Sequence, residues 1–130
     1  MKRIQPDIFI LGETDGTGVG SDNNYADGGG ASDASYDWSL YGRIKETLNG
    51  GSIGALDQHV RNYSPTIHYN YYTGPNSHYL RFLENHDESR INYLYSRNQA
   101  KAGAVLLMKL PGIPIIEPGQ EVGATSQRGL

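Results

Sequence analysis

Short apolar runs recur along the chain and predict buried strands. Residues 7–11 (DIFIL) are almost continuously apolar, and Pro6 and Gly12 bound them. β-branched and aromatic residues favour a strand over a helix in a run this short. Two later apolar runs predict strands at residues 79–83 and 113–116, and residues 34–38 (ASYDW) are expected to form a further short strand.

Helical spacing follows the short strand expected at residues 34–38. Apolar residues recur every four positions over residues 40–48 and therefore lie on one face of a helix. The sequence Asn-Gly-Gly at 49–51 ends that helix. Ser52 can then cap a second helix, whose apolar positions lie within residues 53–60.

A third helix is predicted after the strand at 79–83. Ser96 and Gln99 have the spacing of a capping box, and the Ala- and Leu-rich residues 100–109 continue the helix. Strands that alternate with helices imply a parallel sheet covered by helices, either a small doubly wound sheet or part of a closed barrel. A complete (β/α)8 barrel takes about 250 residues, so four strand units in 130 residues have the size of half a barrel.

Composition limits the classes of function. The formal net charge is −3 and the 11 Lys and Arg residues are scattered, so neither nucleic acid nor an anionic membrane is an expected partner. Cysteine is absent, which excludes disulfides and thiol chemistry. The longest apolar stretch, residues 102–108, is too short to span a bilayer, and residues 1–9 lack a signal-peptide pattern. No cofactor is predicted, and these features leave the cellular compartment unknown.

Two long connections, residues 14–33 and 64–77, are rich in Gly, Asn, Asp, Ser and Tyr. The glycines at 16–20 lack the spacing of a phosphate-binding loop. Residues 22–27 are acidic but lack the ligand order of an EF-hand, and the four histidines lack zinc spacing, so no metal site is predicted. Three tyrosines of the second connection have two open interpretations, stacking on sugar rings or packing against their own domain: Tyr69, Tyr71 and Tyr72.

Three of the four predicted strands are followed by a carboxylate: Glu13, Asp87 and Glu117. Active sites of parallel α/β sheets lie at the C-terminal ends of the strands. Two carboxylates that face each other across a cleft are the apparatus of glycoside hydrolysis, one as acid and one as base or nucleophile. Acidic residues also follow strands simply as turn formers or helix caps, so the pattern alone leaves that alternative open.

The amino-acid sequences of four segments resemble, in the same order, motifs of the α-amylase family (glycoside hydrolase family 13). Residues 82–87 (FLENHD) resemble the F-x-x-N-H-D motif at the end of that family's seventh strand. Residues 4–14 (IQPDIFILGET) are similar to its fifth-strand motif, in which an apolar strand ends in the catalytic Glu. Residues 34–50 resemble the sixth strand with its helix, and residues 110–123 (LPGIPIIEPGQEVG) the segment through the eighth strand. The resemblance covers nearly the whole chain.

The resemblance implies roles for three residues. Glu13 would be the general acid/base, which protonates the glycosidic oxygen and then activates water. Asp87 would be the third carboxylate, which binds ring hydroxyls of the sugar as the ring distorts toward an oxocarbenium ion. His86 would hydrogen-bond the same sugar. Outside this motif, a buried or helix-capping histidine is the simpler interpretation of His86.

The chain departs from the family pattern at the nucleophile. That residue is an Asp on the fourth strand, in a motif like G-x-R-x-D, and no such stretch precedes Glu13. We therefore expect residues 1–130 to be a half-barrel fragment of a glycoside hydrolase that acts on α-glucans and is inactive alone. The alternative is a non-catalytic module, either sugar-binding or a structural half-barrel that associates with itself.

A half-barrel also predicts a homodimer. Its first and last strands, residues 7–11 and 113–116, would be unpaired edges, and edges of this kind pair with other chains. The inner face, which carries residues such as Phe9, Phe82 and Ile115, would be open to water. Two-fold pairing of first strand with last would close an eight-stranded barrel. The competing outcome is a monomer whose two long connections fold over that face.

Overall fold

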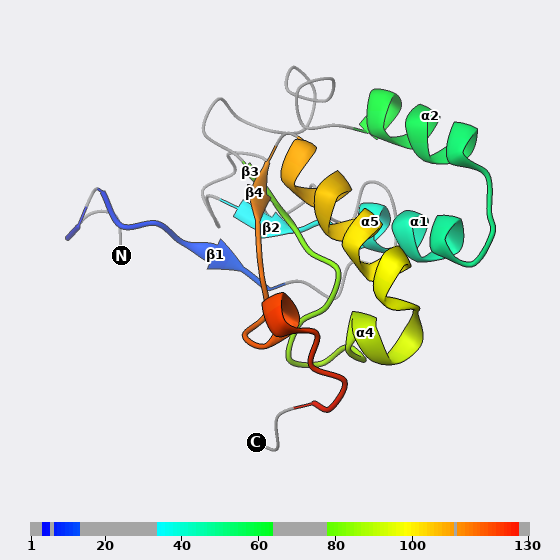
Figure 1. Ribbon diagram of the computed structural model, residues 1–130. Coiled ribbons are helices and arrows are strands. Elements are labelled where there is room, and N and C mark those ends of the chain that lie inside the picture. The colour runs from blue at the N-terminus through cyan, green and yellow to red at the C-terminus, as the bar shows by residue number, and fades with distance from the viewer. Residues whose placement is uncertain (1–3, 6, 14–33, 64–77, 111, 128–130) are drawn as a thin grey trace.

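The computed structural model describes residues 4–5, 7–13, 34–63, 78–110 and 112–127 (Figure 1). These residues contain four strands: β1 Leu11–Gly12, β2 Ala34–Tyr36, β3 His78–Arg81 and β4 Ile113–Pro114. They form one sheet in the order β1-β2-β3-β4, and every neighbouring pair is parallel. The α/β class and the four parallel strands expected from the sequence are confirmed. The two long connections, including Tyr69, Tyr71, Tyr72 and the glycine and acidic motifs, lie outside the described residues.

Each strand is shorter than its apolar run. In β1 only Leu11 and Gly12 enter the ladder, opposite Ala34 and Ser35 of β2. The N–H of Ala34 also donates to the carbonyl oxygen of Ile10 at 3.3 Å, which is where the pairing begins. The prediction of a strand over residues 7–11 is therefore wrong in extent. Apolar composition predicts burial, whereas the length of a strand depends on how far its neighbour runs beside it.

The helices lie together on one side of the sheet (Figure 1). Their bounds are α1 Trp38–Leu48, α2 Ile53–Tyr63, α4 Ile91–Leu94 and α5 Arg97–Lys109, with a short 3-10 helix, η1 Gln120–Val122, after β4. Among the described residues, α1 and α2 lie between β2 and β3 in the sequence, and α4 and α5 lie between β3 and β4. No helix within the described residues is long and apolar enough to cross a membrane.

Side-chain caps fix where the helices begin. The predicted capping box is confirmed: Ser96 Oγ accepts from the N–H of Gln99, and the Gln99 side chain accepts from the N–H of Ser96. α5 accordingly starts at Arg97, three residues before the Ala- and Leu-rich stretch. Ser52 Oγ accepts from the N–H of Ala55 at 3.2 Å, as the sequence predicted for α2. The sequence did not predict α4 or the cap of α1 by Asp37.

One apolar core lies between the helices and the sheet. Its buried residues come from α1, α2, α4, α5 and the segment after β3: Leu40, Ile44, Leu56, Leu83, Ile91, Ala100 and Leu107. The predicted apolar face of residues 40–48 is the one that points into this core. Gly103 lies where a Cβ would meet Leu83 Cδ1 at 3.2 Å, so the absence of a side chain lets α5 approach the sheet closely.

A second core is aromatic and corrects one expectation. Phe82 is 1% exposed, although a half-barrel was expected to leave it open to water. Its ring stacks on Tyr41 at 4.8 Å and makes edge contacts with Tyr36 at 5.1 Å and Trp38 at 4.9 Å. Large rings from β2 and α1 therefore cover Phe82, and this packing could not be predicted from the spacing within residues 79–83.

Candidate active site

The structure brings together the three residues singled out by the sequence. Glu13 directly follows β1, and His86 and Asp87 lie in the loop after β3, with β2 between the two strands. His86 Nε2 lies 3.5 Å from Glu13 Oε1 and 3.3 Å from Asp87 Oδ2. The prediction that both carboxylates point to the same end of the sheet is confirmed, since one ligand atom of each residue lies within 4.8 Å of the others.

The three side chains are open to solvent, with exposed fractions of 54% for Glu13, 48% for His86 and 63% for Asp87. A buried histidine is therefore excluded as the interpretation of His86. Two acceptor groups and an imidazole at this spacing can bind the hydroxyls of one sugar ring. A cation would also fit the spacing, although exposed acidic groups commonly have such spacing without binding one. The catalytic roles of Glu13 and Asp87 stay predictions.

The loop of His86 and Asp87 is shaped by hydrogen bonds on both sides of them. Asn85 is buried, and its Oδ1 accepts from the N–H groups of Asp87 at 3.1 Å and Glu88 at 2.9 Å. This Asx turn is a local bond that short polar side chains favour. On the other side, Tyr41 of α1 donates to Glu88 Oε2 at 2.5 Å. The loop is thereby attached to α1 next to the site.

Lys45 completes the attachment of Glu88. Its Nζ donates to the hydroxyl of Tyr41 at 2.9 Å and lies 3.7 Å from Glu88 Oε2 and 4.7 Å from the centre of the Tyr41 ring. Burial, followed by the hydrogen bond to Glu88 and its charge, raises the pKa of Tyr41. The phenol therefore stays protonated and keeps its role as donor.

A buried ion pair closes the base of the same loop. Glu84 is 0% exposed and Arg90 is 4% exposed, and Arg90 Nη1 donates to Glu84 Oε1 at 2.7 Å. The other carboxylate oxygen of Glu84 accepts from the N–H of Ile91 at 2.5 Å. Burial raises the pKa of Glu84, whereas the Ile91 N–H and the charge of Arg90 act in the opposite direction. This pair could not be predicted from the sequence, in which Glu84 and Arg90 are simply two opposite charges six positions apart.

Arg90 also reaches the next strand. Its Nη2 donates to the carbonyl oxygen of Pro118 at 2.6 Å. Gly119, with φ +98, lies where a Cβ would meet that same nitrogen at 2.4 Å. The guanidinium therefore links the exit of β3 to the exit of β4, and glycine is required at the crossing.

A second buried ion pair joins β2 to β3. Asp37, 4% exposed, pairs with Arg81, also 4% exposed, and accepts from the N–H of Leu40 at 2.9 Å to cap α1. One carboxylate thus starts α1 and neutralises a buried guanidinium at the end of β3. The pair fixes the chain directly after Tyr36 and before Phe82. Sequence reasoning missed it because the two residues are 44 positions apart.

Two further groups stand near the site. Tyr36, the last residue of β2, has its pKa raised by burial first and then by the charges of Glu13, Glu117 and Asp87. Carboxylates that follow three other strands thus act on the same hydroxyl through their charge. Glu117 is half-buried after β4, and its N–H donates to Gln120 Oε1 at 3.3 Å. Glu117 is not part of the group formed by Glu13, His86 and Asp87.

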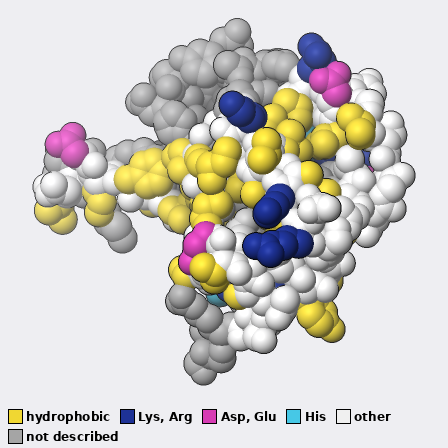
Figure 2. All heavy atoms as spheres, in the orientation of Figure 1, with side chains coloured by type: hydrophobic (Ala, Val, Ile, Leu, Met, Phe, Trp, Pro, Cys, Tyr) yellow, Lys and Arg dark blue, Asp and Glu magenta, His cyan; other side chains and the backbone are white. Residues whose placement is uncertain are grey.

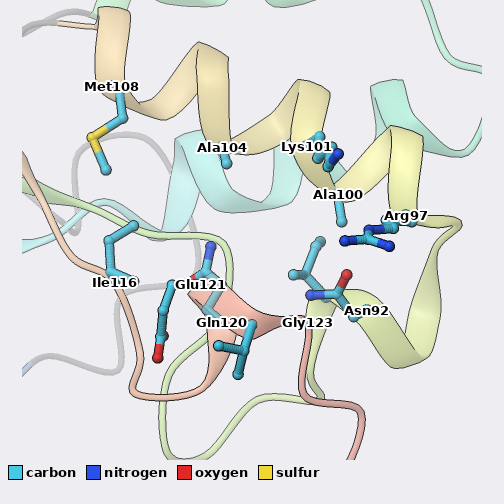
Figure 3. A pocket seen from close by; sticks show the side chains of 12 residues that line it. Asn92, Arg97, Ala100, Lys101, Ala104, Met108, Ile116, Gln120, Glu121 and Gly123 are labelled. Atoms are coloured by element: carbon cyan, nitrogen blue, oxygen red, sulfur yellow. The ribbon is translucent and has the colours of Figure 1, made fainter.

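A pocket of about 320 Å³ lies apart from these residues, between α4, α5 and η1 (Figure 3). Figure 3 shows Met108 and Ile116 facing each other across one end and Arg97 beside Asn92 at the other. None of the three site residues lines this pocket. This pocket is therefore not the site of the carboxylates.

Comparison with known proteins gives a family match over nearly the whole chain. The sequence model described as "Alpha amylase, catalytic domain" matches residues 1–129. The alpha-amylase MalA of Haloarcula japonica is 29% identical over 103 residues. That alignment covers 76% of this chain and 14% of MalA, so the chain spans a small part of this curated relative.

Solved structures show the same fold. An alpha-amylase from H. orenii superposes with a TM-score of 0.78 at 22% identity, and covers 98% of this chain and 26% of its own. The maltogenic alpha-amylase AmyB from Thermotoga neapolitana has a TM-score of 0.73 at 23% identity, with 98% of this chain and 28% of its own covered. A cyclic alpha-maltosyl-(1-->6)-maltose hydrolase from Arthrobacter globiformis has a TM-score of 0.76 at 22% identity, over 97% of this chain and 28% of its own.

Proposed function

The chain belongs to the α-amylase catalytic-domain family, and on that premise we propose that it forms strands five to eight of a (β/α)8 barrel that cleaves α-glucans. β1 would be the fifth strand and β4 the eighth. Glu13 would act as general acid/base, and Asp87 and His86 would bind the sugar at the bond that is cleaved. The consecutive order of the four parallel strands supports this assignment, since a barrel wall has that order and a doubly wound sheet reverses it.

The observation that carries the proposal is the meeting of Glu13 with His86 and Asp87. The two segments are 73 positions apart in the sequence, yet His86 Nε2 lies within 3.5 Å of both carboxylates. Turn formers or helix caps would have no reason to converge from two strands. Convergence at the C-terminal end of a parallel sheet is typical of a catalytic site.

The family nucleophile has no counterpart in this sequence, so we propose that the chain alone does not complete the reaction. A retaining glycosidase needs a second carboxylate to form the covalent glycosyl-enzyme intermediate. Asp7 precedes β1 instead of following a strand, and it is exposed. The chain would therefore bind an α-glucan at one side of the site without cleaving it.

Binding tests the proposal directly. We expect maltotriose to bind the chain in isothermal titration calorimetry and the affinity to fall at least tenfold in Glu13→Gln and Asp87→Asn. Asp57→Asn on α2 is the matched control, because Asp57 is exposed and lies on an element that contributes nothing to the site. Equal affinity in all four proteins would refute the site, and absence of binding by the unsubstituted chain would refute the function.

A second candidate function is a self-associating half-barrel, and exposed apolar residues favour it. Phe9 is 53% and Leu11 is 44% exposed at the β1 edge. Figure 2 shows hydrophobic side chains gathered along the segment that leads into β1. At the other edge, Met108, Ile116 and Val122 are exposed and line the pocket of Figure 3. In a complete barrel the next strand and helix would cover both places.

A further inference from the structure

Tyr36 occupies the centre of the candidate site. In the register of β1 and β2, Gly12 lies opposite Ser35, so Glu13 is the residue beside Tyr36. On the other side Tyr36 lies opposite Leu80 of β3, the strand that leads to Asp87. Side chains at matching positions of neighbouring parallel strands point to the same face of a sheet. The phenol therefore rises between the two segments that carry the carboxylates.

The ring of Tyr36 is held in one orientation. It makes an edge contact with Phe82 at 5.1 Å and 89°, and it stacks with Trp38 at 5.9 Å and 29°. Only 9% of the residue is exposed. A phenylalanine would fill this aromatic cluster equally well, so packing does not account for the hydroxyl. The charges of Glu13, Glu117 and Asp87 all add to the effect of burial in raising the pKa of this hydroxyl, which agrees with its place between their strands in the register.

The chemistry of a sugar explains what such a hydroxyl can do. Each sugar hydroxyl donates one hydrogen bond and accepts others, whereas an ionised carboxylate only accepts. The carboxylates of Glu13 and Asp87 can accept from the sugar's hydroxyls, whereas the lone pairs of those hydroxyls need donors such as the imidazole of His86 and the hydroxyl of Tyr36. Burial and the neighbouring carboxylates raise the pKa of Tyr36, so its O–H stays available as a donor.

We propose that Tyr36 is a further substrate-binding residue of this site, whose hydroxyl donates to a sugar hydroxyl that itself donates to Glu13 or Asp87. The inference rests on the proposed function and adds a contact that selects for a ring hydroxyl at that position. Tyr36 would bind this hydroxyl from the floor of the site. His86 would approach the same ring from the loop after β3.

Tyr36→Phe is the sharpest variant, because it keeps the ring packing and removes only the donor. We expect its affinity for maltotriose in calorimetry to fall by about three- to tenfold, the usual range for one neutral hydrogen bond. Tyr93→Phe is the matched control, since Tyr93 is 71% exposed on α4, and its affinity should not change. In a panel of monodeoxy maltosides, one analogue should bind the unsubstituted chain more weakly than the parent maltoside by the same factor. Tyr36→Phe should bind that analogue and the parent maltoside with equal affinity.

The outcomes separate this inference from the proposed function. Equal affinity of Tyr36→Phe and the unsubstituted chain would overturn the contact and leave the function standing. If the unsubstituted chain binds no maltooligosaccharide, the function and the contact both fall. Should Tyr36→Phe fail to fold, 3-fluorotyrosine at position 36 serves instead. Its fluorine NMR signal must shift on addition of maltotriose, and an unchanged signal under saturating sugar would refute the contact.

Discussion

Arg90 Nη1 donates to Glu84 Oε1 at 2.7 Å with both side chains buried, and this pair closes the loop that carries His86 and Asp87. The same guanidinium holds the carbonyl oxygen of Pro118 at 2.6 Å. One buried cation therefore sets the distance between the exits of β3 and β4. The positions of His86 and Asp87 depend on this contact, because they lie in the loop between Glu84 and Arg90.

Arg90→Met should lower the free energy of unfolding by about 3–5 kcal/mol, because it leaves the charge of Glu84 buried without a partner. The double variant Glu84→Gln/Arg90→Met should recover part of the loss, since Gln can still accept from the N–H of Ile91 and carries no charge. Urea denaturation followed by circular dichroism measures both. Arg97→Met at an exposed position of α5 is the control, and an equal loss in Arg97→Met would contradict the assignment.

Gly119→Ala should destabilise the chain more than Gly123→Ala. Both glycines have positive φ, 98° and 80°, so alanine costs about 1–2 kcal/mol at either position. Only at Gly119 would the new Cβ meet Arg90 Nη2 at 2.4 Å, whereas at Gly123 its nearest neighbour is Asn92 Oδ1 at 3.7 Å. Thermal unfolding of the two variants measures the difference. Equal melting temperatures would show that Arg90 can move aside without loss.

Tyr41→Phe should flatten the pH dependence of stability in alkali. The pKa of Tyr41 is raised above its ordinary value of 10.0, by burial first and then by its hydrogen bond to Glu88. Above pH 10 the unfolded chain therefore releases this proton while the folded chain retains it. The stability that Tyr41 contributes is present below pH 10 and is lost as the pH rises beyond it. Urea denaturation between pH 8 and 11 should show a steeper decline for the unsubstituted chain than for Tyr41→Phe. Identical slopes would contradict the shift.

The chain alone should not hydrolyse an aryl maltoside. On the proposed assignment the chain lacks the family nucleophile, and removal of a catalytic nucleophile costs about 10⁶ in kcat in a well-studied protease. Release of the aryl group, followed by absorbance, should stay at the rate of the buffer blank. Turnover that Glu13→Gln abolishes would overturn this prediction. Glu117, the remaining carboxylate near Tyr36, would then be the first residue to test as a substitute.

On the proposed half-barrel assignment, the chain should sediment as a dimer at micromolar concentration, because β1 and β4 are the edges of the described sheet and can pair across two copies. Leu11→Lys places a charge on the β1 edge and should shift the protein to a monomer. Ile53→Lys is the matched control, because Ile53 is 76% exposed on α2, which connects toward the inner strands β2 and β3 and not the edge strands. It should leave the dimer intact. Sedimentation of the unsubstituted chain as a single 14.3 kDa species would contradict the prediction of a dimer.

The sequence determined the elements that depend on local pattern. The apolar spacing of residues 40–48 predicts α1, and Ser96 with Gln99 predicts the start of α5, because caps and helix faces involve residues three or four positions apart. The alternation of strands and helices along the chain predicts the parallel sheet, because a helix between two strands returns the chain so that the next strand runs in the same direction. Glu13, His86 and Asp87 could be predicted as site residues because they follow predicted strands within segments that resemble family motifs.

Only the tertiary structure decided which side chains from distant parts of the sequence lie in contact. Tyr36 enters the site because the register sets Gly12 opposite Ser35, and no spacing within the sequence fixes that register. Phe82 is buried because rings from β2 and α1 meet over it. The ion pairs of Arg90 with Glu84 and of Arg81 with Asp37 arise where burial removes water and a charge must find a partner. Burial of this kind is a property of the packed chain, so local pattern names the candidates and packing assigns their partners.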